Sequence, residues 1–410
     1  MTSPLDRQAR DVRDAARVLA RTSDTVRREV IRDVAERLIV ATDDILRANE
    51  LDLADYDGDA TGRDRLKLSD ERIRGVANGV RDVADLPNPL GEVVSSDVRP
   101  NGLVVQRVRV PLGVVGVIYE NRPNVTMDVA ALCLRSGNAA FLRGSSSAQR
   151  SNRALVGVWH AALVAAGLPS ASVSLVDDPS HATATQFMKL NGFIDCLIPR
   201  GGPSLIAAMR EHATVPYVID GDGNCHVYVD RDADVDMALA IITNAKTSRP
   251  GVCNAAESIL VHDEVADQIL PRLSAALPNV EIRGDARVCA AIATAIPASD
   301  EDFASEFLGP IVSVAVVPSV EAAIEHVALY GTGHSEAIVT ENEKTAMRWI
   351  TEVDAAAVLV NASTRFVDGG ELGLGAEVGI STQKLHARGP MGIKELTCVK
   401  WVVQGKGHVR

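Results

Sequence analysis

The chain has 410 residues, of which 46% are hydrophobic and 23% are charged. That is enough sequence for two or three domains with substantial cores. The formal net charge of -12 argues against a nucleic-acid-binding surface, because an acidic protein and a phosphate backbone repel each other. No apolar run reaches the roughly 18 to 20 residues of a membrane-spanning helix, and charged residues begin at Asp6. We therefore expect a cytoplasmic protein that binds neither nucleic acid nor membrane.

The six cysteines are scattered, and no two are closer in sequence than Cys225 and Cys253. This spacing excludes a CxxC metal clip and a dense disulfide framework, and it favours a reducing compartment. His326 and His334 have no cysteine or carboxylate partners at metal-ligand spacing. We interpret both histidines as structural and expect no metal site.

Residues 5–85 are predicted to be helical. Val26, Val30, Val34 and Leu38 recur every fourth residue among charged residues. This spacing puts an apolar stripe on a charged helix, which indicates packing and carries no chemistry.

Two short segments predict strands that could join subunits. Residues 98–110 alternate around Asn101 and Gly102, a pattern typical of a β-hairpin with a tight turn. Residues 397–404 predict another short strand. We expect this terminal strand to pair with the hairpin of a neighbouring subunit, in a homo-oligomer that is most simply a symmetric dimer.

After Pro111, strand-like and helix-like segments alternate, which predicts βαβ units and a mostly parallel sheet. A second α/β block begins with a helix at Asp234. The predicted strands cover residues 113–119, 139–142, 193–198, 226–229, 258–261, 311–317 and 357–360, and the predicted helices include 148–166 and 320–328.

Cys253 is predicted to lie in a loop. Asp234 can cap the preceding helix, and that helix must end by Arg249 because Pro250 follows. Gly251 permits unusual backbone angles, and the guanidinium of Arg249 favours a thiolate. Cys253 is thus a candidate nucleophile. The alternative is a small buried hydrophobic residue, as expected for Cys133, Cys196, Cys289 and Cys398.

Eight sequence runs resemble those of gamma-glutamyl phosphate reductases, a family of the aldehyde dehydrogenase superfamily. The runs are PLGVVGVIYENRPNVTMDVAALCLRSGNAAFLRGSSS (111–147), IPRGG (198–202), GNCHVYVD (223–230), RPGVCNAAE (249–257), EFLGP (306–310), GTGHSEAIVT (331–340), VNASTRF (360–366) and LGLGAEVGISTQKLHARGPMG (372–392). Together they span essentially all of residues 110–402, so the resemblance is far more specific than one short motif.

The resemblance implies an α/β, aldehyde dehydrogenase-like fold with a Rossmann-like cofactor domain, an α/β catalytic domain and a β oligomerisation arm. We expect the NADP-binding domain at residues 1–96 and 112–225, and the catalytic domain at 226–390. The arm is expected at residues 97–111 and 391–410.

The resemblance also implies roles for two catalytic residues. Cys253 takes the nucleophile position, and Asn121 takes that of the oxyanion-hole asparagine; the alternative for Asn121 is a turn residue before Pro123. Hydrolytic relatives carry a water-activating glutamate in a stretch that matches residues 219–224, and this chain has no glutamate there. Its absence suits a reductase that must protect a thioester from water.

The superfamily binds its dinucleotide without a GxGxxG motif. The cofactor-binding candidates are Arg143, Gly144, Ser145, Ser146 and Glu306. The first four lie between a strand and a helix start, where N–H groups and hydroxyls can meet phosphate. Arg143 takes the place of a ribose-binding lysine, and the lack of a glutamate at Ser146 favours NADPH. Glu306 matches the glutamate that holds the nicotinamide ribose. A solvated loop and a surface carboxylate are the alternatives.

Substrate recognition requires cations for the phosphate and the α-carboxylate. The candidates are Arg249, Lys384, His386 and Arg388. Each is explained equally well as an exposed charge or a structural ion-pair partner.

The reaction implied by the resemblance is the NADPH-dependent reduction of an acyl phosphate, L-glutamate 5-phosphate, to L-glutamate 5-semialdehyde through a cysteine thioester, in proline biosynthesis. Channelling from glutamate 5-kinase is a further expectation. A coenzyme-A-acylating or hydrolytic aldehyde dehydrogenase is the alternative among enzymes. A binding protein that has lost catalysis is the other alternative, and the intact cysteine and asparagine motifs weigh against it.

Overall fold

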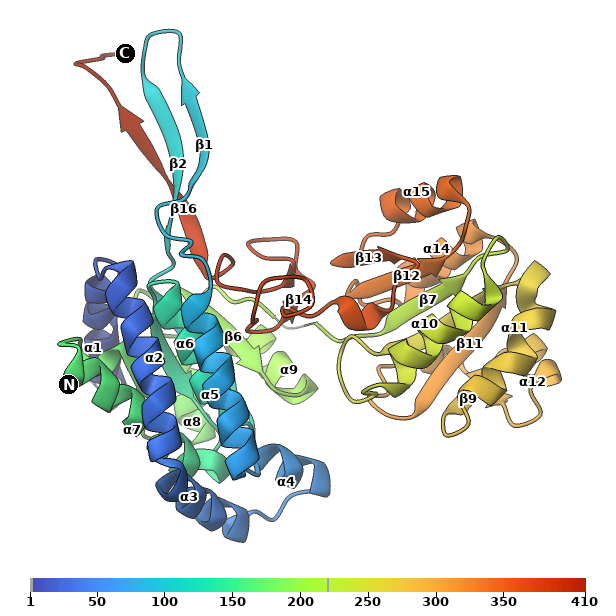
Figure 1. Cartoon of the computed structure of the whole chain (residues 1–410), viewed down its shortest axis with the longest axis horizontal. Helices are drawn as coiled ribbons and strands as arrows, with labels where there is room; N and C mark the ends of the chain where they lie inside the picture. Colours follow the sequence, from blue (N-terminus) through green and yellow to red (C-terminus); the bar gives the residue numbers. More distant parts are fainter. Residues whose placement is uncertain (1–2, 220) are drawn as a thin grey trace. The chain divides into compact units, whose positions relative to one another are not determined.

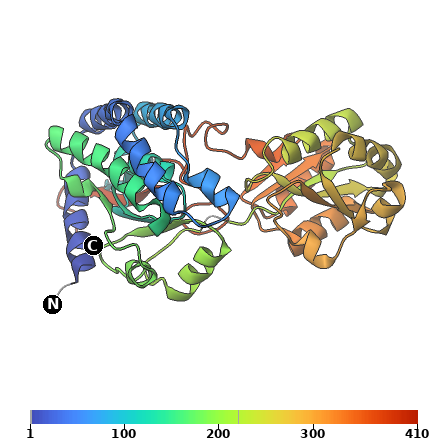
Figure 2. The same cartoon turned by 90° about the horizontal axis from the view of Figure 1, so that it is seen from below.

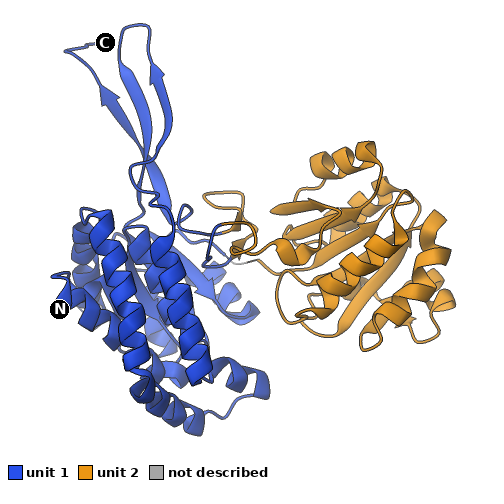
Figure 3. Cartoon of the chain, viewed as in Figure 1, with its two compact units in different colours: residues 1–219, 374–379, 391–410 blue, residues 220–373, 380–390 orange. Residues whose placement is uncertain are grey.

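Two parallel β-sheets, each packed against helices, make up most of the chain (Figures 1 and 2). The computed structural model describes residues 3–219 and 221–410. Contacts divide these residues into two units (Figure 3), of which the first contains 3–219, 374–379 and 391–410 and the second contains 221–373 and 380–390.

The first unit opens with helices, as predicted for residues 5–85. They are α1 (Pro4–Leu19), α2 (Asp24–Val40), α3 (Thr42–Asp55), α4 (Ala60–Leu66) and α5 (Asp70–Asp85). The side chains of Ser3 and Ser23 accept hydrogen bonds from N–H groups in the first turns of α1 and α2, which explains where these helices begin. The predicted apolar stripe on α2 is buried, apart from the half-buried Val26.

A four-stranded parallel sheet in the order β5-β4-β3-β6 forms the centre of the first unit. α6 and α7 contact this sheet, and α2, α3 and α5 contact α6 and α7 in turn. Every residue of β3 is buried, which is why its sequence is a continuous apolar run. The elements are β3 (Val114–Tyr119), α6 (Asn124–Arg135), β4 (Ala139–Arg143), η1 (Ser146–Ala148), α7 (Gln149–Ala165), η2 (Ser170–Ser172), β5 (Val173–Leu175), α8 (His181–Phe187), β6 (Cys196–Arg200) and α9 (Pro203–His212).

The second unit is built on a seven-stranded parallel sheet in the order β10-β9-β11-β8-β7-β12-β13. Along β7, Val227 and Val229 pack with side chains of α10 and α11, whereas Tyr228 stacks on Trp349 of α15. The alternation puts helices on both faces of the sheet (Figure 1). The elements are β7 (Cys225–Val229), α10 (Val235–Thr247), β8 (Ala256–His262), α11 (Asp263–Ala276), β9 (Glu281–Gly284), α12 (Ala286–Ala291), β10 (Ile296–Pro297), α13 (Asp300–Phe303), β11 (Ile311–Val317), α14 (Val320–Tyr330), β12 (Ser335–Val339), α15 (Glu343–Glu352), β13 (Ala357–Val360), η3 (Thr364–Phe366), β14 (Ile380–Ser381) and β15 (Gly389–Pro390).

A separate antiparallel sheet in the first unit contains β1 (Val93–Val98), β2 (Val104–Pro111) and β16 (Thr397–Gln404), with β2 in the middle. A hairpin forms around the predicted turn, but its first strand begins at Val93, before the predicted start at residue 98. Gly102 in the turn has a positive φ of 89°, which glycine adopts readily. The expectation that the terminal strand pairs with a neighbour's hairpin is wrong. β16 pairs with β2 of its own chain along its whole length, because β1 occupies only one edge of β2 and the other edge is open to the returning chain.

The division into units departs from the predicted domain boundaries at two places. Residues 221–225 fall in the second unit, because Cys225 is the first residue of β7 in the larger sheet. Residues 374–379 fall in the first unit, where Val378 N donates to Met391 O (2.9 Å). Residues 1, 2 and 220 of the predicted NADP-binding domain lie outside the described residues.

Within the described part of the chain, no helix combines the length and apolarity needed to cross a membrane.

Candidate active site

Cys253 lies in the loop between α10 and β8, as predicted. Asp234 caps α10 by accepting a hydrogen bond from Met237 N (2.7 Å), and the helix ends at Thr247, before Pro250. Cys253 belongs to no disulfide, and its side chain is half-buried. A thiol in this setting is partly open to a ligand and is held on a short connection between two buried elements.

Four loops meet at one edge of the seven-stranded sheet. They precede β11, β8, β7 and β12, which are neighbours in that order. Because these strands are parallel, their amino ends lie along the same edge. The loops contain residues 306–310, 249–254, 221–224 and 331–334, so four motifs that are far apart in the sequence are assembled around Cys253.

Gly223 and Cys225 hold the backbone of Cys253. A Cβ atom added to Gly223 would lie 1.7 Å from the Cys253 carbonyl oxygen, so only glycine permits this close approach. The Cys225 thiol donates a hydrogen bond to the same oxygen (3.1 Å). Burial raises the pKa of the Cys225 thiol well above its usual value. Cys225 therefore acts as a structural donor, and Cys253 is the nucleophile candidate of the two.

Asn224 is fully buried and connects its own loop to the loop before β12, to the ends of α13 and α14 and to β8. Its Nδ2 donates to Phe303 O (2.7 Å) and to Tyr330 O (2.9 Å). Its backbone N–H donates to Thr332 Oγ1 (3.1 Å), and its Oδ1 accepts from Ser258 Oγ (3.3 Å). With its polar groups satisfied in this way, Asn224 fixes the residues on either side of it.

Glu306 is bound to the same framework. Its Oε1 accepts a hydrogen bond from Gly223 N (2.9 Å). Leu308, two residues later, has a positive φ of 52°, and its N–H donates to Glu257 Oε1 (3.2 Å). Glu257 on β8 forms a fully buried ion pair with Lys246 on α10. A chain of contacts therefore links the loop of Glu306 to the elements on both sides of the cysteine loop.

The turn η3 contacts both ends of the cysteine loop, and sequence reasoning assigned it no role. The Thr364 hydroxyl donates to Asn254 O (2.7 Å), and Asn254 Nδ2 donates to Val367 O (2.9 Å). On the other side, Arg365 Nε donates to Ser248 Oγ (3.2 Å). The VNASTRF motif could have pointed to this segment, but nothing local in the sequence reveals partners more than a hundred residues away.

Asn121, in the first unit, follows β3 and has a positive φ of 30°. Its Oδ1 accepts hydrogen bonds from Ser145 Oγ (3.0 Å) and Ser147 Oγ (2.5 Å). Its Nδ2 donates to Tyr56 OH (3.3 Å), which leaves one of its two N–H groups for another acceptor. The hydroxyl of Ser145, predicted to contact the cofactor, therefore faces Asn121.

Two other predicted cofactor residues have structural contacts. Arg143 is buried and donates to Pro179 O and Ser180 O, and burial lowers the pKa of its guanidinium. A Cβ atom added to Gly144 would lie 2.2 Å from Asn152 Nδ2, so packing alone requires glycine there.

The helix start after these residues is partly occupied by a carboxylate. Asp52 on α3 accepts hydrogen bonds from Arg150 N (3.3 Å) and Ser151 N (2.8 Å) in the first turn of α7. It also accepts one from Ser151 Oγ (2.7 Å). A bound phosphate therefore depends on the N–H groups that precede this turn, near the exposed Ser146.

Comparison with known proteins identifies the family. The chain matches the aldehyde dehydrogenase family model over residues 4–290 and 283–402. It is 52% identical to the gamma-glutamyl phosphate reductase of Clostridium beijerinckii over 382 residues, which cover 92% of each chain. It is 51% identical to that of Moorella thermoacetica over 403 residues, which cover 97% of this chain and 96% of the relative. The crystal structure of gamma-glutamyl phosphate reductase from Thermotoga maritima matches with a TM-score of 0.97 and 44% identity, covering 100% of both chains.

This chain belongs to the gamma-glutamyl phosphate reductase family. It is therefore an oxidoreductase, and the predicted aldehyde dehydrogenase-like α/β fold is confirmed.

In this member of the gamma-glutamyl phosphate reductase family, the predicted substrate-binding cations differ in their surroundings. Lys384 and Arg388 both form ion pairs with Asp354, and together they lower the pKa of that carboxyl. Arg249 and His386 are exposed, and His386 has a positive φ of 69°. Two of the four candidates thus share one carboxylate.

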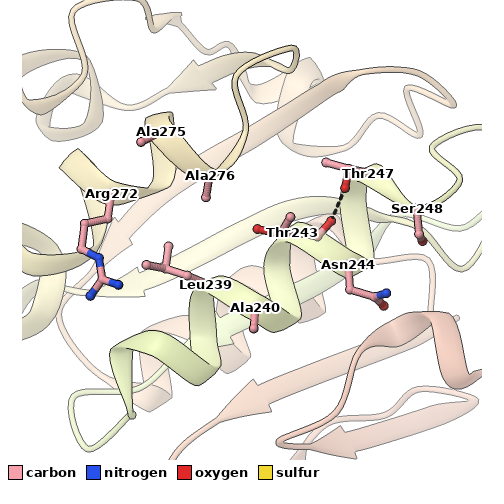
Figure 4. A pocket seen from close by; sticks show the side chains of 9 residues that line it. All are labelled: Leu239, Ala240, Thr243, Asn244, Thr247, Ser248, Arg272, Ala275 and Ala276. Carbon is pink, nitrogen blue, oxygen red and sulfur yellow. Dashed lines mark hydrogen bonds between the residues drawn. The ribbon is translucent and has the colours of Figure 1, made fainter.

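A groove of about 720 Å³ runs between α10 and α11 (Figure 4). Its lining includes Leu239 and Asn244 of α10 and Arg272 of α11. None of the predicted site residues lines it, so its volume does not make it the active site.

Within the described ranges, one group has metal-ligand spacing, formed by His262, Asp263 and Glu264, whose ligand atoms lie within 4.8 Å of one another. His262 Nδ1 accepts a hydrogen bond from Glu264 N (3.2 Å) and caps α11. This role in helix capping accounts for the cluster.

Proposed function

We propose that this chain reduces L-glutamate 5-phosphate to L-glutamate 5-semialdehyde and phosphate with NADPH, the second step of proline biosynthesis from glutamate. Full-length relatives that bear the name gamma-glutamyl phosphate reductase support this substrate and reaction. The observation that carries the proposal is the set of four loops around Cys253, since they hold a half-buried thiol in a fixed frame. A cytoplasmic location and channelling from glutamate 5-kinase belong to the same proposal.

Cys253 is the proposed nucleophile. Its thiolate attacks the acyl carbon, the bond from that carbon to the phosphate oxygen breaks, and phosphate leaves with the electron pair. The amide of Asn121 and the backbone N–H of Cys253 stabilise the oxyanion. The result is a thioester. Bound NADPH supplies the hydride that reduces it. The C–S bond then breaks, which releases the aldehyde and restores the thiolate.

The proposed cofactor residues are Arg143, Gly144, Ser145, Ser146 and Glu306. Ser146 is exposed and uncharged, so it does not repel a 2′-phosphate. Arg143 Nε is buried with no hydrogen-bond partner among the described residues. An unsatisfied buried donor and a neutral side chain both fit a phosphorylated dinucleotide.

The sheet formed by β1, β2 and β16 is the proposed oligomerisation arm. Val98, Trp401 and Val403 are exposed on it, each over more than half of its surface. A second copy of the chain, in the simplest case a symmetric dimer, would cover these apolar side chains.

The reverse reaction tests the function. NADP reduction is followed with L-glutamate 5-semialdehyde and phosphate, with NAD in a parallel assay. Cys253→Ser should abolish the activity, because a hydroxyl is a far weaker nucleophile than a thiolate. Cys289→Ser, at another half-buried cysteine, is the matched control and should retain it. A Cys253→Ser enzyme within about tenfold of the parent would contradict the nucleophile assignment. A requirement for coenzyme A in place of phosphate would favour the acylating alternative.

A further inference from the structure

Arg365 has hydrogen-bond donors that no carboxylate in the described chain occupies. Its side chain is half-buried, and its Nε donates to Ser248 Oγ. A guanidinium carries five N–H donors, so both terminal nitrogens remain for a ligand. Among residues 3–219 and 221–410, no acidic side chain forms an ion pair with it.

The position of Arg365 is fixed relative to the nucleophile. The preceding residue, Thr364, is fully buried, and its hydroxyl donates to the carbonyl of Asn254, the residue after Cys253. Ser248 lies at the opposite end of the same loop. The guanidinium is therefore held on a short turn that is bonded to the loop on both sides of Cys253, as a recognition residue requires.

Three other cations of the second unit are already paired, whereas Arg249, which forms no ion pair with any described residue, is exposed. Lys246 is neutralised by Glu257, and Lys384 and Arg388 share Asp354. Arg365 is instead half-buried, and no carboxylate among the described residues pairs with it, so its guanidinium can bind an anion from outside.

Phe366 follows Arg365 on the same short turn and adds an exposed apolar side chain to it. Of the six phenylalanines, all of which the structure describes, it alone is exposed, with 50% of its surface accessible. A guanidinium and an exposed aromatic ring on one short turn fit a ligand in which a carboxylate ends a short methylene chain. Phosphate offers no apolar part for such a ring.

We propose that Arg365 binds the α-carboxylate of the γ-glutamyl substrate and that Phe366 packs against its methylene groups. This inference rests on the proposed function and names the specificity residue of that site. Arg365 then selects an aldehyde that carries an α-carboxylate over a plain aldehyde, while phosphate is bound by other groups.

Steady-state kinetics in the reverse direction test the inference. Arg365→Gln should raise the KM for L-glutamate 5-semialdehyde by about 10- to 100-fold, the loss expected for a charged hydrogen bond. The KM for phosphate and the kcat should change little, because the interaction is equal in the ground and transition states. With butanal, which lacks the carboxylate, parent and variant should have equal kcat/KM. Arg365→Lys should restore part of the affinity, since it keeps the charge and loses the planar fork.

Arg348→Gln is the control, because it removes an arginine of the same unit that is paired with Glu321 and Glu352; both KM values should stay at the parent level. Ser248→Ala is a milder second variant that frees the guanidinium without removing it, and should raise only the KM for the semialdehyde. Unchanged kinetics in Arg365→Gln, or a rise confined to the phosphate KM, would overturn the assignment while the parent remains active. A parent enzyme that is inactive on L-glutamate 5-semialdehyde would overturn the proposed function as well.

Discussion

The Asn121 region and the Cys253 loop are held in place by different kinds of groups. Around Asn121 the partners are neutral hydroxyls, from Ser145, Ser147 and Tyr56. Around the cysteine loop, the framework contains charged or titratable groups with no exposed surface. They are the pairs Lys246 with Glu257 and His226 with Glu336.

The difference matters because the two kinds of contact respond differently to substitution. A neutral hydrogen bond contributes about 1 kcal/mol to stability, whereas removing one partner of a buried ion pair costs about 3–5 kcal/mol. Single substitutions near Asn121 should therefore lower kcat strongly and the free energy of unfolding only a little. Substitutions in the buried pairs around the cysteine loop should mainly lower the free energy of unfolding.

Lys246→Met gives the largest expected effect on stability. It leaves the Glu257 carboxylate buried without its cation, and should lower the free energy of unfolding by about 3–5 kcal/mol. Burial already raises the pKa of Glu257 to about 7 and lowers that of Lys246, and each partner opposes the shift of the other. Denaturant unfolding measures the loss. The double variant with Glu257→Leu should recover most of it, because no unpaired charge remains.

Arg74→Met is the control for this experiment. Arg74 pairs with Asp70 on the exposed face of α5, and exposed pairs contribute little, so its unfolding should stay close to that of the parent. If Lys246→Met and Arg74→Met lower the free energy of unfolding equally, the buried pair of Lys246 and Glu257 contributes no more to stability than an exposed pair.

Asn121→Ala should act on the rate instead. Loss of one oxyanion donor lowers kcat by about 10²- to 10³-fold, with a smaller change in KM. The Ser145 and Ser147 hydroxyls already lie 2.8 Å apart and can hydrogen-bond each other without the amide, so the stability should change little. Because Asn121 has a positive φ, Asn121→Gly is the matched variant that removes the amide without backbone strain. An effect confined to KM in both variants would make Asn121 a ground-state binding residue.

Local patterns in the sequence predicted much of the fold. The strands at residues 311–317, 357–360 and 397–404 have the predicted bounds, because the first two are apolar runs and the third is a short β-branched and aromatic segment that ends before Gly405. The loop position of Cys253 followed from Asp234 at one end of its helix and Pro250 at the other, which are signals that act within a few residues.

The partners of the site residues were beyond such reasoning. Asp52 caps α7 from almost a hundred positions away, and Thr364 reaches Asn254 across 110 positions. Neither residue carries a periodic or turn signal. The pairing of β16 within its own chain was missed for the same reason, since strand alternation predicts a strand and not its neighbour.

His326 extends the comparison from substitution to pH. It lies on α14 among the rings of Phe303, Tyr330 and His226, at centroid distances of 5.2, 4.7 and 5.6 Å. Burial, and secondarily the neighbouring His226, lowers its pKa from 6.5 to about 3. The unfolded chain therefore binds a proton below pH 6.5 that the folded chain does not bind until about pH 3, so this site loses stability as the pH falls through that window. From pH 7.5 to pH 5 the loss should be about 1–2 kcal/mol, and His326→Phe should abolish it. Phe303→Leu and Asn121→Gly are the controls for this prediction. Phe303→Leu disturbs the same ring cluster without removing a titratable group, and should lower the unfolding free energy equally at both pH values.

Asn121→Gly should have the same pH dependence of unfolding as the parent between pH 7.5 and pH 5, since neither the amide of Asn121 nor the hydroxyls around it titrate there. If the unfolding free energy of His326→Phe falls between pH 7.5 and pH 5 as much as that of the parent, His326 is not the source of the loss. The buried titratable groups would then not give the second unit a pH dependence that the neutral network around Asn121 lacks.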